Sequence, residues 1–225
     1  MCGVAGVLGG SGTAERERLV RGMLGALAHR GPDDEGVWTD EGAGLTLGHR
    51  RLAIIDTSPA GHEPMSYRGR YWLTFNGEVY NFLELREELE AKGHSFASRT
   101  DAEVLLAGYA EWGVDVLDRL VGMFAFAIWD AAERVLFLAR DRAGEKPLYY
   151  ASAGGRLAFA SELSALTLCP WVDATPDRTA LAQYLQYGYV PSPRTAYAGA
   201  RKLPPAHSLL WQGGSAVVGR YWDPL

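Results

Sequence analysis

Cys2 and Cys169 carry the only thiols in this 225-residue sequence, and the position of the first suggests a specific chemistry. A cysteine thiolate is a strong nucleophile, but a thiol with an ordinary pKa near ~8.5 needs a base beside it. Removal of Met1 would give Cys2 a free α-amine with a pKa of roughly 7.7–8.0, which is substantially neutral near pH ~7.5. The nucleophile and the general base would then belong to one residue.

Cys2 also has two plainer interpretations, as a small packed residue or as an acylation site. A lipidation signal for the thiol needs residues upstream of the cysteine, and the sequence has only Met1 there. Myristoylation requires glycine directly after Met1, where this sequence has Cys2. Cys169 precedes Pro170 and Trp171, which favours a packed or loop position. Taken alone, Cys2 favours a structural role, so other motifs must decide.

The composition limits the classes of partner. The chain is 48% hydrophobic with a net charge of −5, which predicts one substantial core and disfavours nucleic acid or an anionic membrane as the main partner. No apolar stretch approaches the roughly 20 residues of a membrane-spanning helix, and the first residues do not resemble a signal peptide. We therefore expect a cytoplasmic protein that acts on a small molecule.

The sequence predicts no metal and no nucleotide on this chain. Its five histidines show neither paired helical spacing nor neighbouring cysteine ligands. Neither the phosphate-binding loop G-x-x-x-x-G-K-[ST] nor the dinucleotide motif G-x-G-x-x-G is present. We expect no cofactor here.

Short elements would position the chemistry. Residues 3–8 read as a buried strand with Cys2 at its tip, and residues 16–27 read as a helix. Residues 70–76 alternate between polar and apolar side chains, which predicts a strand that stops at Asn76-Gly77. Asn81 would then cap a helix. Residues 100–103 (TDAE) fit a capping box that opens a helix ending near Trp112 and places Asp101 in the first turn.

The rest of the chain predicts further strands and then a different kind of segment. Apolar stretches at 123–129, 135–139, 147–152 and 157–160 read as strands, and without regular βαβ alternation they favour an α+β fold. Prolines punctuate the sequence from Pro170 onward, where only the stretch after Asp177 looks helical. We place a boundary there, with a domain over 2–169 and an extension over 170–225.

Several ordered strings resemble the class II glutamine amidotransferases. They are MCGVAG at 1–6, HRGPD at 29–33, HRRLAIID at 49–56 and FNGEVYN at 75–81. Four more strings are similar to the N-terminal glutaminase domain of glutamine-dependent asparagine synthetases, namely TDAE at 100–103, GMFAFA at 122–127, ARDR at 139–142 and FASE at 159–162. The resemblance implies a four-layer αββα N-terminal-nucleophile hydrolase sandwich with a C-terminal extension.

The resemblance also implies roles in glutamine hydrolysis for individual residues. Cys2 would be the nucleophile, and it would pass through a thioester to release glutamate and ammonia. Asn76 and Gly77 match the oxyanion hole, since an amide N–H and a main-chain N–H can stabilise the charge that develops. By itself Asn-Gly favours a hairpin turn, but the string that follows favours the functional interpretation.

The same resemblance implies how L-glutamine is recognised. Arg51 would bind the α-carboxylate, and Asp101 would bind the α-ammonium group, with help from Glu78 and from main-chain carbonyls near Ile54. Their plainer interpretations are a surface ion pair and a helix cap. Arg30 would brace the site without contacting the substrate.

The tail resembles the link to a synthetase. The strings YGYVP at 187–191 and RKLPPAH at 201–207 carry this resemblance, yet no pyrophosphate-binding loop follows them. ATP and magnesium are therefore expected only on a synthetase partner, either a separate chain or a missing C-terminal domain. An oligomer, a freestanding glutaminase, a catalytically quiet docking module and an N-terminal-nucleophile hydrolase of another amide stay open.

Overall fold

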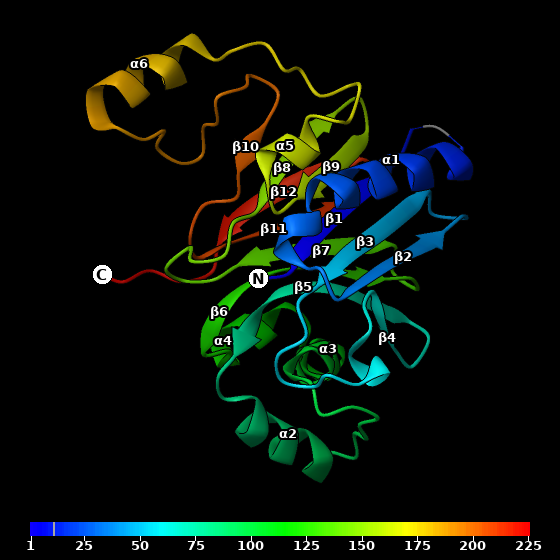
Figure 1. Cartoon of the computed structure of the whole chain (residues 1–225). Helices are drawn as coiled ribbons and strands as arrows, with labels where there is room; N and C mark the ends of the chain where they lie inside the picture. The colour runs from blue at the N-terminus through cyan, green and yellow to red at the C-terminus, as the bar shows by residue number, and fades with distance from the viewer. Residues whose placement is uncertain (11) are drawn as a thin grey trace.

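The computed structural model describes residues 1–10 and 12–225, and its strands form two six-stranded sheets (Figure 1). Sheet A contains, in spatial order, β10 (Arg201–Lys202), β8 (Tyr149–Ala153), β9 (Arg156–Ala160), β1 (Gly3–Leu8), β3 (Leu45–Arg51) and β2 (Asp34–Asp40). Sheet B contains β12 (Ser215–Arg220), β11 (His207–Gln212), β7 (Val135–Arg140), β6 (Gly122–Asp130), β5 (Tyr71–Val79) and β4 (Met65–Tyr67). The pairings between these strands are antiparallel.

Helices cover the outer face of each sheet (Figure 1). The helices are α1 (Thr13–Ala26), α2 (Phe82–Ala91), α3 (Asp101–Trp112), α4 (Val116–Arg119), α5 (Leu163–Leu166) and α6 (Arg178–Tyr187). α1 packs on β1, β2 and β3 of sheet A, α3 packs on β5 of sheet B, and α2 lies outside α3. The order of layers is therefore helix, sheet, sheet, helix, and α6 lies apart from them at one end of Figure 1.

Three buried apolar clusters fill the spaces between these layers. β6 shows how one strand serves two of them, because successive side chains of a strand point to opposite faces. Phe124 and Phe126 join the cluster under α3, whereas Ala125 and Trp129 join the cluster between the two sheets. Truncating such a buried phenylalanine to alanine typically costs about 3–5 kcal/mol.

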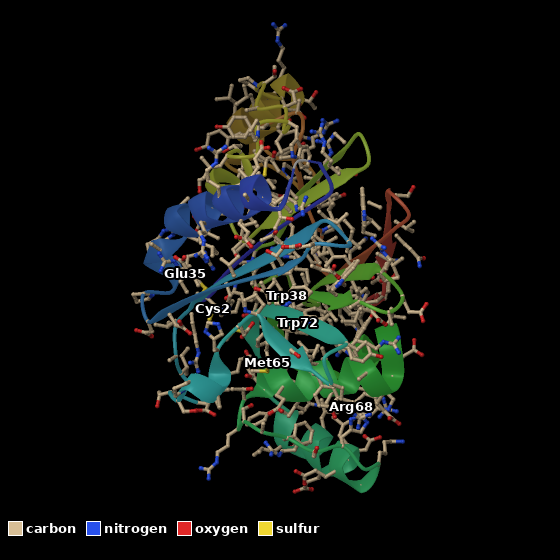
Figure 2. The ribbon with its side chains drawn as sticks, turned by 90° about the vertical axis from the view of Figure 1, so that its right-hand side faces the viewer. Cys2, Glu35, Trp38, Met65, Arg68 and Trp72 are labelled. Atoms are coloured by element: carbon tan, nitrogen blue, oxygen red, sulfur yellow. The ribbon has the colours of Figure 1, made fainter. Side chains whose placement is uncertain are left out.

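An aromatic pair joins the two sheets toward the end of β2 that lies away from Arg51. Trp38 of β2 stacks on Trp72 of β5 with ring centroids 4.0 Å apart, and both lie between the sheets in Figure 2. Stacked aromatic rings contribute roughly 0.5–1.5 kcal/mol beyond the area that they bury. This pair therefore helps to hold the strands of the two sheets at a fixed distance.

The predicted α+β, four-layer arrangement is confirmed, and several elements agree closely with the sequence. β1 has the predicted bounds and Cys2 directly precedes it, while β6 to β9 match the four predicted strands with small shifts at their ends. The first helix begins earlier than predicted, at Thr13. The sequence analysis did not predict β2, β3 and β4.

Two predictions about residues 76–81 are wrong. The strand does not stop at Asn76-Gly77, because Gly77 and Glu78 continue the pairing with β6 and β5 ends at Val79. Asn81 stands at the start of α2 but makes no side-chain cap bond; its amide instead binds Arg119 O and Val121 N, at 2.9 and 3.0 Å. A neighbouring strand thus keeps Asn-Gly extended where the local sequence favours a turn.

The tail is built into both sheets. β10 pairs with β8 in sheet A, β11 pairs with β7 in sheet B, and only residues 203–206 separate them. The helix predicted after Asp177 is α6, and the Asp177 carboxylate caps it by accepting from Thr179 N at 2.9 Å. The boundary near Pro170 stays a prediction.

Two observations bear on membrane and metal chemistry. Within residues 1–10 and 12–225, no helix is long and apolar enough to cross a membrane. Over the same ranges, no three or more histidine, cysteine, aspartate or glutamate side chains come together as metal ligands. The absence of a metal and of a cofactor stays a prediction.

Candidate active site

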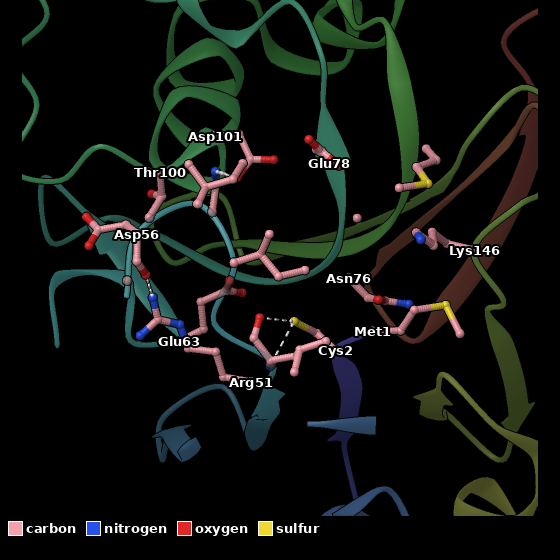
Figure 3. Close-up of a pocket in the computed structure, with 17 residues that line it drawn as sticks. Met1, Cys2, Arg51, Asp56, Glu63, Asn76, Glu78, Thr100, Asp101 and Lys146 are labelled. Carbon is pink, nitrogen blue, oxygen red and sulfur yellow. Dashed lines mark hydrogen bonds between the residues drawn. The ribbon is translucent and has the colours of Figure 1, made fainter. Parts of the chain in front are cut away.

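A cavity of about 200 Å³ opens where β1, β5 and α3 meet. Figure 3 shows side chains from separate parts of the chain around it. All six residues that the sequence analysis assigned to a site line this cavity, namely Cys2, Arg51, Asn76, Gly77, Glu78 and Asp101. Their roles stay predictions, but the fold brings them to one place.

Cys2 is held in place by its neighbours on both sides. Arg30 donates from Nε to the Cys2 carbonyl oxygen at 2.9 Å and from Nη1 to Glu162 at 2.9 Å, so it braces the chain as expected. The Cys2 thiol lies 3.4 Å from Leu52 N, which donates to Sγ, and 3.7 Å from Leu52 O. The sulfur therefore has a fixed position at the cavity wall (Figure 3).

The surroundings keep this thiol protonated. Burial is the main cause that raises the pKa of Cys2 from 9.0 to about 11; a charge on Glu63 would add to the rise, while the Leu52 N–H opposes it. In the structure Met1 is present and also lines the cavity, so the α-amine belongs to Met1 and Cys2 carries an amide. Deprotonation of the thiol thus requires a base delivered directly to the sulfur.

The edge of β5 explains how a main-chain donor reaches the cavity. In an antiparallel strand, every second residue turns its N–H and C=O toward the same neighbour. Phe75 N donates to the Glu63 carboxyl at 2.7 Å and Val79 N donates to the Asp101 carboxyl at 2.9 Å, both away from β6. Gly77 lies between them in this alternation, so its N–H points out of the same edge toward the cavity.

Asn76 supplies a second donor. The residue is 1% exposed, and neither its Nδ2 nor its Oδ1 has a hydrogen-bond partner. Since a buried unpaired amide costs about 1–3 kcal/mol, its retention beside the thiol needs a reason. Its place in the cavity lining leaves this amide available to a molecule bound there.

Gly77 is required by space at this position. An added Cβ would lie 2.3 Å from the carbonyl oxygen of Met123 and 2.7 Å from Cα of Phe124. β6 therefore approaches so closely that only glycine fits. With Asn76, the strand presents two donors to one region of the cavity.

Arg51 organises the loop over the cavity. It is 9% exposed, and it donates from Nη1 to Ser58 O at 2.9 Å and from Nη2 to Asp56 O. The loop passes so close that a Cβ at Gly61 would clash with the guanidinium. Two of the Arg51 N–H groups that were predicted to bind a substrate carboxylate therefore bind the loop instead. This loop places Ile54 in the cavity wall.

Asp101 and Glu78 form an acidic pair on the opposite side (Figure 3). Burial raises the pKa of Asp101 from 3.8 to about 6, and the charge of Glu78 adds to the rise, whereas the Val79 N–H opposes it. Thr100 Oγ1 caps α3 by accepting from Glu103 N at 3.1 Å, as the capping box predicts. Among the residues that the structure describes, no cation forms an ion pair with either acid, which makes the pair a suitable place for an ammonium group.

The sequence analysis missed other residues of this cavity. The added ionisable side chains include Asp56, on the loop after β3, and two buried groups: Glu63, which precedes β4, and Lys146. Neither of the two buried groups lies in the strings that carried the resemblance. Their type and spacing give no local signal, because only the fold brings them to the cavity.

Comparisons with known proteins agree with this geometry. The family model described as a glutamine amidotransferase domain matches residues 1–222. The chain is 44% identical to asparagine synthetase [glutamine-hydrolyzing] 1 of Bacillus subtilis over 91% of its own length and 32% of that protein. It is 39% identical to asparagine synthetase [glutamine-hydrolyzing] 3 of the same organism, over 99% of its own length and 37% of the relative.

A solved structure supports the fold. The glutamine phosphoribosylpyrophosphate amidotransferase of B. subtilis superposes with a TM-score of 0.73 at 22% identity, over 98% of this chain and 49% of that one. This likeness confirms the four-layer sandwich of two antiparallel sheets between helices. The chain spans about a third of the length of the two curated relatives. From the family match over nearly its whole length, the chain belongs to the class II glutamine amidotransferase domains.

Proposed function

We propose that the chain hydrolyses L-glutamine to L-glutamate and ammonia through a thioester on Cys2. The observation that carries this proposal is the unpartnered, buried Asn76 amide that lines one cavity with the Cys2 thiol. The Gly77 N–H at the open edge of β5 supplies a second donor. A catalytically quiet docking module would have no need to keep such a group unpaired.

Recognition of a free amino acid follows from charge. The α-ammonium group would lie between Asp101 and Glu78, and the α-carboxylate would reach Arg51 and the loop that it organises. The side-chain amide would then point toward Cys2. An amide inside a peptide has no free ammonium group to pair with the two acids, which disfavours a peptidase or acylase.

The acylation step uses the amine of Cys2 after Met1 is removed. The neutral α-amine takes the thiol proton while the sulfur attacks the amide carbon, and the amide oxygen becomes an oxyanion held by Asn76 and Gly77. The carbon–nitrogen bond then breaks, and the protonated amine returns its proton to the leaving group. Ammonia departs and a γ-glutamyl thioester remains.

Hydrolysis of the thioester runs through the same groups. The α-amine accepts a proton from water as the water oxygen attacks the carbonyl carbon, which forms a second oxyanion in the same hole. The carbon–sulfur bond breaks, glutamate leaves, and the amine returns the proton to the thiolate. The enzyme ends in its starting state.

The energetics favour a concerted first step. Burial at the cavity wall raises the pKa of the thiol, so full proton transfer to an α-amine ahead of the attack is uphill. The thiol therefore stays protonated until a substrate carbonyl group and the oxyanion donors are in place. This ordering would suppress attack on other electrophiles in the resting enzyme.

Exposure of the amine is the test of this proposal. We would prepare the chain with a cleavable N-terminal extension, so that Cys2 is blocked before cleavage and N-terminal after it, and confirm both forms by intact mass. Glutamate release should begin only after cleavage, and asparagine or a glutaminyl peptide should not replace glutamine. Equal activity with the extension in place would rule out the amine as the base.

We also propose that the ammonia serves an amidation of the asparagine-synthetase type. The support is the naming of the relatives, in which a matching segment forms about a third of a longer chain. A synthetase domain or a separate synthetase chain would bind ATP and magnesium and receive the ammonia. Proteins co-purified from native cells should add ATP-dependent amidation to glutamine hydrolysis, and no such activity in any fraction would contradict this assignment.

A further inference from the structure

Glu63 is a buried carboxyl group in the glutamine cavity that the proposed mechanism does not use. It is 6% exposed, precedes β4, and lines the cavity together with Cys2. Its backbone is fixed by close packing, because a Cβ at Gly36 of β2 would lie 1.9 Å from the Glu63 carbonyl oxygen. The side chain therefore enters the cavity from a rigid wall, as Figure 3 shows.

The contacts of Glu63 suit an uncharged group. Its Oε2 accepts from Phe75 N at 2.7 Å, and its one ion-pair contact in the described part of the chain is with His49 Nε2, 3.7 Å away. His49 donates instead to Phe75 O at 2.9 Å, and burial lowers its pKa from 6.5 to about 4, so it is neutral. A buried carboxylate with a single donor and no charged partner is costly, whereas a neutral acid is not.

The charged groups around the cavity also bear on the protonation state of Glu63. Burial raises the pKa of Glu63 well above 4.5, and the charge of Asp101 adds to the rise, whereas the Phe75 N–H and Arg51 oppose it. An ionised Glu63 would in turn disfavour the Cys2 thiolate. A negative charge here would also oppose the oxyanion formed during the reaction.

Phe75 links this carboxyl group to the oxyanion donors. β4 pairs with β5 only at residues 71–73, so the peptide groups of Phe75 lie beyond the end of β4. Glu63 accepts from its N–H and His49 donates to its carbonyl oxygen, in place of a neighbouring strand. The next two residues along β5 are Asn76 and Gly77.

We propose that Glu63 is a positioning residue that works as a neutral carboxylic acid, holding the Phe75 N–H and with it the oxyanion donors of β5, without adding charge beside Cys2. This inference rests on the proposed glutaminase function. If the proposal is right, the charge of the Glu63 side chain is unnecessary, whereas the side-chain oxygen that accepts from Phe75 N is necessary. Glutamine at this position would preserve the oxygen, and leucine would remove it.

The first experiment reads the charge without any need for activity. We would measure the rate of Cys2 alkylation by iodoacetamide at pH 7 in the wild-type protein and in Glu63→Gln, with site-resolved mass spectrometry. Equal rates are expected, because no charge is lost. If Glu63 is ionised, its removal would lower the thiol pKa and speed alkylation by about tenfold for each pKa unit, which would overturn the proposal. Glu90→Gln on α2 is the matched control.

The second experiment separates position from charge. Glu63→Gln should keep kcat within about threefold, whereas Glu63→Leu should lower kcat by about 10- to 100-fold with little change in KM, since Phe75 N loses its acceptor. Thermal melts identify a variant that fails to fold, in which case the Gln variant alone decides. A large loss of kcat in Glu63→Gln, or full activity in folded Glu63→Leu, would overturn the proposal. An inactive wild-type protein would instead contradict the glutaminase assignment, while the alkylation rates would still report the charge.

Discussion

Cys169 is buried and Cys2 is half-buried, and the regions around them are built differently. Burial raises the pKa of Cys169 to about 12, and in the described part of the chain its Sγ finds one hydrogen-bond partner, the Met23 sulfur at 3.9 Å, in the apolar layer beneath α1. Cys2 is half-buried at a cavity wall, with main-chain polar groups at its sulfur and the Asn76 amide on the same cavity. The comparison teaches that the groups around a thiol, more than its own acidity, distinguish a nucleophile from a packing residue.

The largest expected difference in glutamate release is between the variants that remove one sulfur or the other. Cys2→Ala should lower glutamate release to background, a loss of at least ~10³-fold, because the sulfur that forms the thioester is gone although the α-amine remains. Cys169→Ala should retain the wild-type kcat. The measurement is glutamate release by the folded variants, and substantial turnover by Cys2→Ala would mean that another nucleophile acts.

The second largest effect is expected at Asn76, the proposed oxyanion donor, which has no counterpart in the described surroundings of Cys169. Asn76→Ala should lower kcat by about 10²–10³-fold and leave KM for glutamine nearly unchanged, because the amide acts on charge that develops in the transition state. The same change removes an unpaired polar group, so the free energy of unfolding should not fall. Steady-state kinetics and a thermal melt check both parts, and an effect on KM alone would assign Asn76 to ground-state binding.

The acidic pair should affect binding more than chemistry. Asp101→Ala should raise KM for glutamine about tenfold or more, since an ion pair with the α-ammonium group is lost. In the wild-type protein, KM should rise as the pH falls through about 6, because the raised pKa of Asp101 lets the carboxylate become protonated there. A pH profile of KM that is flat between pH 5 and pH 7 would contradict this role.

The smallest effect is expected at the packing thiol. Cys169→Ala should lower the free energy of unfolding by about 1–2 kcal/mol, because a buried sulfur is lost from a filled layer. Urea denaturation measures this change. If the variant instead loses activity without losing stability, the contrast between the two cysteines drawn here is wrong.

Some of the fold could be predicted because its signals are local. β1 is a short apolar stretch, and the capping box at Thr100 marks the start of α3. β2, β4 and β12 could not be predicted in the same way, since edge strands have mixed patterns and are fixed by their partners. Asn76-Gly77 shows the same limit, because pairing with β6 overrides the local preference for a turn.

The site was predictable from resemblance more than from spacing. Cys2, Arg51 and Asp101 lie far apart in the sequence, and only matched family strings grouped them. Glu63 was missed because an isolated glutamate before a proline carries no local sign of burial. What brings it to the cavity is the path of the chain between β3 and β4, which no short pattern encodes.

The placement of β10 and β11 in different sheets has a practical consequence for fragment design. A chain cut near residue 176 would leave β8 without its outer neighbour and β7 without β11, so both sheets would gain a bare edge. Exposed edges of this kind recruit other strands and promote aggregation. The shortest fragment worth expressing for biochemistry therefore extends through Arg220. If a shorter fragment is insoluble, the cause is its exposed strand edges, and the result says nothing about catalysis.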